Sequence, residues 1–304
     1  MSRSRSAPTV QSRFIPAPDG LSLHVRCYGA ATGAVPLLCL PGLTRNHADF
    51  EPLARHLAAD AEHPRAVFAL DSRGRGLSGY DPDWRNYNPA TELSDVIAVM
   101  AALGLPRAVL LGTSRGGILT MLLAATQPTL IAGAILNDIG PVIERDGLLR
   151  IKGYAGRIPA PKTMAEGADA LRALFGAQFP NLDDAGWRAW AERSWRQGAD
   201  GLIARYDQRL GDTMEELTPE QPIPDLWAPF AALPQVPLMV VRGALSDILS
   251  AETVDAMRQQ RPDLEAIEVA DQGHAPLLAE PDIMQRISDF LVRCDRAPIP
   301  ASLA

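Results

Sequence analysis

Residues 112–116 read Gly-Thr-Ser-Arg-Gly, and they directly follow the apolar run Ala-Val-Leu-Leu at 108–111. A serine flanked at two positions on either side by glycine is typical of a sharp turn between a strand and a helix. The turn forces the serine into a strained backbone conformation, and side chains two positions away would collide with neighbouring backbone. Residues 118–125 are mainly apolar and predict the helix that must follow. The stretch therefore predicts a strand, a turn with Ser114 at its tip, and a helix.

Short apolar runs alternate with helical patterns on both sides of this turn. A hairpin is predicted within 14–27, where Asp19-Gly20 is a strong turn pair. Further strands are expected at 36–40, 66–70, 131–136, 236–242 and 264–269, and further helices at 49–59, 91–103 and 283–292. Strands that alternate with helices indicate a parallel sheet with helices on both faces.

The alternation stops between residues 141 and 234. No buried strand is expected there, and this stretch holds four of the five tryptophans, Trp187, Trp190, Trp195 and Trp227. Prolines open and close it, which indicates a mainly helical insertion that covers the sheet as a lid. The sequence thus predicts a flexible tail at 1–13, a core domain formed by 14–140 and 235–304, and a helical cap at 141–234.

Composition excludes several classes of protein. The chain has 304 residues, of which 47% are hydrophobic and 21% charged, as in ordinary soluble globular proteins. A net charge of −7 argues against nucleic acid as a partner, because phosphate binding needs a basic surface. No apolar run approaches the length of a transmembrane helix or resembles a signal peptide. The number and spacing of the three cysteines fit neither a framework of disulfide bonds nor a metal site. A cytoplasmic protein without a metal or another cofactor is expected.

Two other residues could complete a catalytic site with Ser114. A serine hydroxyl is a poor nucleophile at neutral pH, so it needs a base to take its proton and an acid to orient that base. His274 is the candidate base, because it lies in a loop between the strand at 264–269 and the last helix. Asp247 follows the strand at 236–242 and is the preferred acid. Asp138 also follows a strand near the expected mouth of the site and is the alternative.

The chain resembles the α/β-hydrolases of the capped, esterase-like kind from the first hairpin to the last helix. The resemblance rests on the turn at 112–116, on Leu-Pro-Gly-Leu at 40–43, on Asp-Ser-Arg-Gly-Arg-Gly-Leu-Ser at 71–78, and on the order Ser114, Asp247, His274. It implies a mostly parallel eight-stranded sheet flanked by helices, with a helical lid inserted after the sixth strand.

The same resemblance implies roles for single residues. Ser114 would be the nucleophile, His274 the general base and then acid, and Asp247 the group that orients His274. The backbone N–H groups of Leu43 and Arg115 would bind the oxyanion. Many relatives have His-Gly where this chain has Pro-Gly at 41–42, but the N–H of Leu43 survives that change.

The implied activity is hydrolysis of a small carboxylic ester or lactone through an acyl-enzyme. Cleavage of a carbon–carbon bond in a ring-cleavage product uses the same triad and is the close alternative. A receptor that binds a small molecule without turning it over is the alternative from another class.

Several polar and aromatic residues have two possible roles. Arg115 either pairs with a nearby carboxylate and braces the turn, or attracts an anionic substrate together with Arg45. Asp138, if it is not the acid, caps its loop or borders the pocket. Trp187 is either a pocket residue or a packing residue, and it shares a helix face with Trp190.

Residues outside this set are expected to be structural. Asp71 and Arg73 are interpreted as fixing a turn through local hydrogen bonds. His47, which lies beside the helix expected at 49–59, is expected at the surface.

Overall fold

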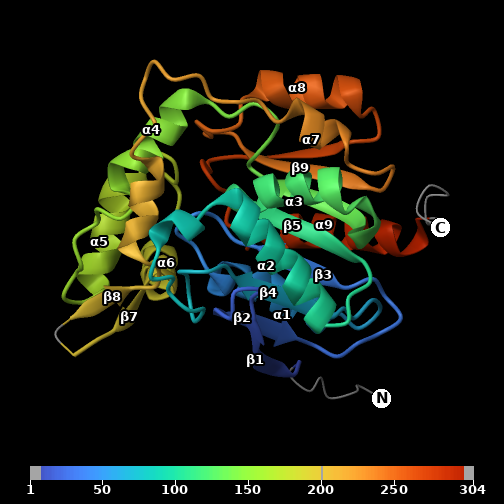
Figure 1. The fold of residues 1–304 in the computed structure, drawn as a ribbon, viewed down its shortest axis with the longest axis horizontal. Coiled ribbons are helices and arrows are strands. Elements are labelled where there is room, and N and C mark those ends of the chain that lie inside the picture. The colour runs from blue at the N-terminus through green and yellow to red at the C-terminus, as the bar shows by residue number, and fades with distance from the viewer. Residues whose placement is uncertain (1–7, 200, 298–304) are drawn as a thin grey trace.

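An eight-stranded sheet forms the centre of the molecule in the computed structural model, which describes residues 8–199 and 201–297 (Figure 1). The strands lie in the order β1-β2-β4-β3-β5-β6-β9-β10. Strand β2 runs antiparallel to both of its neighbours, and the other strands pair in parallel. The bounds are β1 Val10–Pro16, β2 Ser22–Tyr28, β3 Leu37–Leu40, β4 Val67–Asp71, β5 Ala108–Thr113, β6 Ile131–Asn137, β9 Leu238–Gly243 and β10 Glu265–Val269. The mostly parallel eight-stranded sheet is confirmed.

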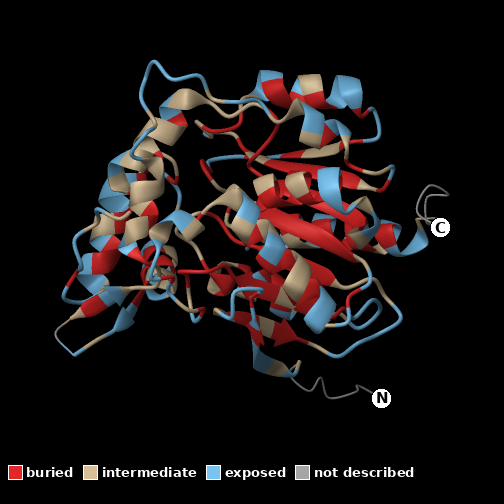
Figure 2. Ribbon diagram, in the orientation of Figure 1, coloured by how far each residue is buried: buried red, intermediate tan, exposed pale blue. Residues whose placement is uncertain are grey.

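Helices cover both faces of this sheet. Side chains of α2 (Pro89–Ala102), α3 (Arg115–Thr126), α7 (Trp227–Ala231) and α8 (Ala251–Gln260) pack on one face. Those of α1 (Glu51–Ala58) and α9 (Pro281–Arg296) pack on the other. Within β5, Ala108 and Leu110 face the first layer and Val109 and Leu111 the second. A central strand is therefore apolar on both sides, and Figure 2 shows the sheet as the most buried part of the chain.

The segment between β6 and β9 forms the helical insertion expected after the sixth strand. It holds α4 (Arg145–Tyr154), α5 (Met164–Phe175), α6 (Asp184–Ser194) and the 3-10 helix η4 (Gln208–Met214), and α4 to α6 lie to the left of the sheet in Figure 1. Phe175, Trp187, Trp190 and neighbouring residues form an apolar cluster of their own there. A small hairpin, β7 (Trp195–Gln197) and β8 (Leu202–Ala204), was not predicted, because strands of three residues carry almost no alternation signal.

Two other elements differ from the sequence prediction. Strand β1 begins at Val10, inside the predicted tail, because residues 10–13 pair with β2, although residues 11–13 are polar and exposed. Residues 1–7 of that tail lie outside the described part of the chain. Helix α8 was not predicted, and only three of its residues, Thr253, Val254 and Met257, are buried. Among the described helices, none is long and apolar enough to span a membrane.

The turn at 112–116 has the predicted geometry. Ser114 joins β5 to α3 with φ 50° and ψ −113°, a conformation that side-chain-bearing residues rarely adopt. A Cβ atom at Gly116 would lie 2.1 Å from the carbonyl oxygen of Leu40, and one at Gly112 would lie 2.4 Å from the backbone of Gly116. Only glycine at both positions lets α3 approach the sheet this closely, which leaves Ser114 at the carboxyl end of β5.

Candidate active site

Ser114, His274 and Asp138 form a continuous chain of hydrogen-bonding side chains. The Nε2 atom of His274 lies 2.9 Å from the Oγ of Ser114, and its Nδ1 lies 2.8 Å from the Oδ2 of Asp138. A carboxylate can only accept, so Nδ1 carries the proton and Nε2 is free to accept the hydroxyl proton of Ser114. The arrangement therefore has the geometry of a nucleophile, a base and an orienting acid.

Asp138 is held in place by the strands on either side of it. It follows β6 directly with φ 56°, and its side chain is fully buried. The N–H of Gly243 donates to its Oδ1 at 2.8 Å, and the hydroxyl of Ser246 donates to its Oδ2 at 2.6 Å. With the ring of His274, three donors converge on one carboxylate, which fixes its orientation.

The expectation that Asp247 orients His274 is corrected by this geometry. Asp247 instead accepts two hydrogen bonds from Arg150 of α4, at 2.5 Å from Nε and 2.8 Å from Nη2. Burial alone would raise the pKa of Asp247, but the hydrogen bonds from Arg150 outweigh it and lower the pKa. Asp247 thus ties the loop after β9 to the helical insertion. Of the roles considered for Asp138, the structure shows a bond to His274 and no contribution to the cavity wall.

The loop after β3 brings a second set of groups to Ser114. Leu43 and Gly42 line the same cavity as Ser114, and a Cβ atom at Gly42 would lie 3.7 Å from that of Ser114. The backbone N–H groups of Leu43 and Arg115 donate to no acceptor within residues 8–199 and 201–297. Two unpaired amides beside one hydroxyl are the feature that the predicted oxyanion site requires.

A buried ionic network joins the residues that carry these two amides. The guanidinium of Arg75 donates to the carbonyl oxygen of Leu43 at 2.7 Å and to Glu92 at 2.7 Å. Glu92 in turn accepts from the Nε of Arg115 at 2.8 Å. Burial raises the pKa of Glu92, yet the charges of Arg75 and Arg115 lower it overall, so the carboxyl stays ionised. Of the two roles considered for Arg115, the structure shows the bracing one.

A cavity of about 110 Å³ adjoins Ser114 and His274. Its walls are mainly apolar and come from the loop after β3, from α4 and α5, and from α6, with Ile151, Leu171, Phe175 and Trp190 among them. Arg45 lines this cavity, as expected of a substrate-binding candidate.

Trp187 does not line the cavity. It is 2% exposed and stacks on Trp190, with ring centroids 5.5 Å apart and planes 5° from parallel. The prediction of Trp187 as a pocket residue is therefore wrong. Trp190, on the same helix face, lines the cavity, and Trp187 packs in the apolar cluster of the insertion.

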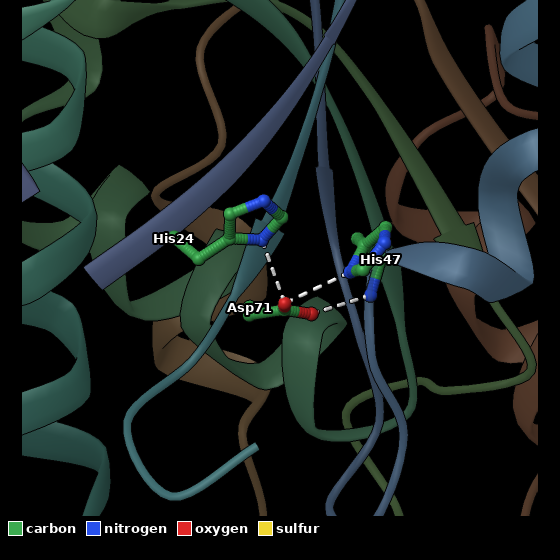
Figure 3. A group of neighbouring side chains, drawn as sticks. All are labelled: His24, His47 and Asp71. Carbon is green, nitrogen blue, oxygen red and sulfur yellow. Dashed lines mark hydrogen bonds and ion pairs between the residues drawn. The ribbon is translucent and has the colours of Figure 1, made fainter. Parts of the chain in front are cut away.

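His24, His47 and Asp71 form a buried polar cluster close to the loop after β3 (Figure 3). The expectation of a surface position for His47 is wrong, because its ring and its backbone N–H both bond to Asp71, at 2.8 and 2.7 Å. The ring of His24 bonds to the same carboxylate at 2.8 Å, and the N–H of Leu77 donates at 2.9 Å. Four nitrogen atoms therefore surround one carboxylate.

The donor set of this cluster fits a hydrogen-bonded brace better than a metal centre. A metal would need the Nδ1 lone pairs of both rings, but these atoms face the carboxylate as proton donors. Burial raises the pKa of Asp71, but hydrogen bonds from His24 and His47 lower it to about 2. The ionised Asp71 thus anchors the segment that follows the loop after β3 to the end of β4. Its role is structural, as predicted, but only the bond from Leu77 is local to the turn.

Comparisons with known proteins identify the family of this chain. Residues 37–284 match the model of the Alpha/beta hydrolase family, and the chain belongs to that family. A 3-hydroxybutyrate-oligomer hydrolase of Cupriavidus necator is 34% identical over 278 residues, which cover 88% of this chain and 93% of the relative. A 2-(acetamidomethylene)succinate hydrolase of Mesorhizobium japonicum is 27% identical over 89% of this chain and 92% of its own. The crystal structure of an alpha/beta hydrolase from Novosphingobium aromaticivorans is 42% identical, with a TM-score of 0.87, and covers 93% of this chain and 98% of that one.

Substitution of Asp138 should lower hydrolase activity far more than substitution of Asp247. Asp138→Asn removes the acceptor that fixes the proton on Nδ1 of His274, so kcat should fall by about 10⁴-fold, as for a triad that loses its orienting carboxylate. Asp247→Asn removes a partly exposed ion pair, so kcat should change by less than about 10-fold. Steady-state kinetics on one ester measures both. A larger loss for Asp247→Asn than for Asp138→Asn would contradict the assignment.

Proposed function

We propose that this protein is a serine hydrolase that cleaves a small carboxylic ester or lactone through an acyl-enzyme. The chain Ser114–His274–Asp138 at the wall of an apolar cavity is the observation that carries the proposal. Relatives named as hydrolases of 3-hydroxybutyrate oligomers and of 2-(acetamidomethylene)succinate support hydrolysis of a small acid derivative.

The proposed reaction begins with proton transfer from the hydroxyl of Ser114 to Nε2 of His274. The Oγ atom attacks the substrate carbonyl, and the resulting oxyanion accepts hydrogen bonds from the amides of Leu43 and Arg115. The imidazolium of His274, stabilised by Asp138, then gives its proton to the leaving alcohol oxygen as the acyl-enzyme forms. Water, deprotonated by His274, attacks the acyl group, and the imidazolium returns that proton to Oγ of Ser114 as the bond to the acyl group breaks and the acid leaves.

The buried network would keep the two oxyanion donors at a fixed separation. Arg75 holds the carbonyl of Leu43, and Glu92 links Arg75 to Arg115, so neither amide moves independently of the other. Preorganised donors are effective because they need no reorientation as charge develops, and each is worth about 3 kcal/mol in the transition state. The network therefore acts through position and does not touch the substrate.

The helical insertion is proposed to act as the lid of the cavity and to set the shape of the substrate. Helices α4, α5 and α6 supply Ile151, Leu171, Phe175 and Trp190 to its wall, whereas the sheet supplies the reacting groups. We therefore expect the segment at 141–234 to set much of the shape of the cavity, while the reacting groups come from the core.

A panel of esters and lactones with acyl chains of two to eight carbons tests the proposed activity. Short substrates should be turned over fastest, because the cavity is about 110 Å³. Ser114→Ala should lower kcat by about 10⁶-fold on every substrate, because the nucleophile that lies 2.9 Å from His274 is lost and only the residual effect of the oxyanion amides remains. Turnover retained by Ser114→Ala, or the absence of turnover across the panel, would contradict the proposal.

Arg115→Gln separates the two roles considered for that side chain. Loss of the bond to Glu92 should disturb the oxyanion amide and lower kcat by up to about 10²-fold, the cost of a small misplacement of catalytic groups. The loss should be equal on neutral and on carboxylate-bearing esters, because the side chain does not line the cavity. A selective loss on the charged ester would instead favour direct recognition of an anion by Arg115.

A further inference from the structure

Three side chains with ionisable carboxyl or guanidinium groups interrupt the mainly apolar wall of the cavity. Arg45 and Asp49 come from the segment after the loop that carries Leu43, and Arg193 comes from the end of α6. All three line the cavity that contains Ser114 and His274. Their side chains are 21%, 24% and 20% exposed, so each lies mostly within the protein and partly in the cavity.

Arg45 donates most of the hydrogen bonds that the carboxylate of Asp49 accepts. Nε and Nη2 of Arg45 donate to the two oxygens of Asp49 at 2.7 and 2.5 Å, and Nη1 donates to the hydroxyl of Ser194 at 2.9 Å. The guanidinium also lies over the ring of Trp190, 5.4 Å from its centroid. Arg45 is thus held on all sides by the protein.

Arg193 is less completely paired. Its Nε donates to Asp49 at 3.2 Å, and its Nη1 and Nη2 donate to no acceptor within residues 8–199 and 201–297. Burial raises the pKa of Asp49, but the charge of Arg45 and the hydrogen bonds it donates lower it overall, so Asp49 is ionised and counts as one negative charge. Two guanidinium groups facing one carboxylate leave an excess of one positive charge at the cavity wall.

An excess charge at a mostly apolar wall is poorly solvated, and an anion placed beside it is bound more strongly than it would be in water. A guanidinium with two free terminal nitrogens matches the two oxygens of a carboxylate. The backbone of Arg193 is fixed at the same time, because its carbonyl oxygen accepts from the side chain of Asn46 at 2.8 Å. The group is therefore positioned by the protein before any ligand binds.

We propose that Arg193, supported by Arg45 and Asp49, binds a free carboxylate of the substrate, so that the substrate class is short aliphatic esters that carry a second, ionised carboxyl group. The inference rests on the proposed function, because it assigns the ester carbonyl to Ser114 and the carboxylate to the cationic wall. The apolar side chains of Ile151, Leu171 and Phe175 are among those that line the cavity, and they suit a short hydrocarbon segment between the two ends. Arg193 is a binding residue in this scheme and takes no part in proton transfer.

Two isosteric esters measure the preference directly. Monoethyl succinate carries a carboxylate where ethyl levulinate carries a neutral acetyl group. The native protein should have the higher kcat/KM for monoethyl succinate. Arg193→Gln should lower that value by about 10- to 10²-fold, mainly through KM, which is the effect of one charge-assisted interaction, and should change the value for ethyl levulinate by less than about 3-fold.

Arg188→Gln is the matched control, because it removes the same charge from the exposed face of the same helix. It should leave both kcat/KM values within about 2-fold of native, as expected for a solvent-screened charge. Equal losses of Arg193→Gln on the two esters, or the same selectivity change in Arg188→Gln, would overturn the carboxylate site.

A binding measurement separates this inference from the proposed function. Calorimetric titration of Ser114→Ala with succinate needs no turnover. The dissociation constant should rise by about 10-fold or more when Arg193→Gln is added to Ser114→Ala. An unchanged constant would overturn the carboxylate site even if esters are hydrolysed, whereas failure of the native protein to hydrolyse either ester, with binding as expected, would overturn only the proposed function.

Discussion

The close approach of α3 to the end of β5 is the constraint on which the site depends. Gly112 and Gly116 allow backbone contacts that any Cβ atom would prevent, and the chain between them turns through Ser114 at φ 50°. This turn places the hydroxyl at the carboxyl end of the sheet, pointing away from the core. The strain is maintained because both flanking elements are packed on every side by buried residues.

The order of strands brings the other groups to the same place. Strand β5 lies between β3 and β6, so the loop with Leu43 and the residue Asp138 emerge on either side of Ser114. The loop after β10 returns over this edge and places His274 between Ser114 and Asp138. Segments far apart in sequence therefore meet because parallel strands end on one side of the sheet. Behind them, Glu92 links Arg115 to Arg75, which donates to Leu43, and Asp71 bonds to His47, which follows the loop after β3.

Local patterns were sufficient to predict the strand–turn–helix at Ser114, the position of His274 between the last strand and the last helix, and the helical insertion. These features depend on short-range signals: apolar runs, glycine spacing and proline positions. The choice between Asp138 and Asp247 was different. Both follow neighbouring strands, β6 and β9, and only the packing of α4 shows that Arg150 engages Asp247. The sequence did carry a signal that favoured Asp138. It follows its strand without intervening residues and therefore stays near the sheet.

Other errors have the same origin. Trp187 and Trp190 share a helix face, and the direction of that face relative to the cavity depends on how α6 packs on α5. The burial of His47 depends on a carboxylate from β4 that lies 24 residues away along the chain. Arg193 was missed because a lone arginine in an arginine-rich segment carries no sequence signal, and its meaning comes from sharing Asp49 with Arg45.

The central claim is that His274, oriented by Asp138, activates Ser114. The most direct test is the reaction of the native protein with a fluorophosphonate, in which fluoride leaves as the serine oxygen bonds to phosphorus, followed by peptide mapping by mass spectrometry. A single adduct on Ser114 is expected, formed more slowly by about 10²-fold or more in His274→Ala, because the base is then absent. An adduct on another residue, or an unchanged rate in His274→Ala, would contradict the account.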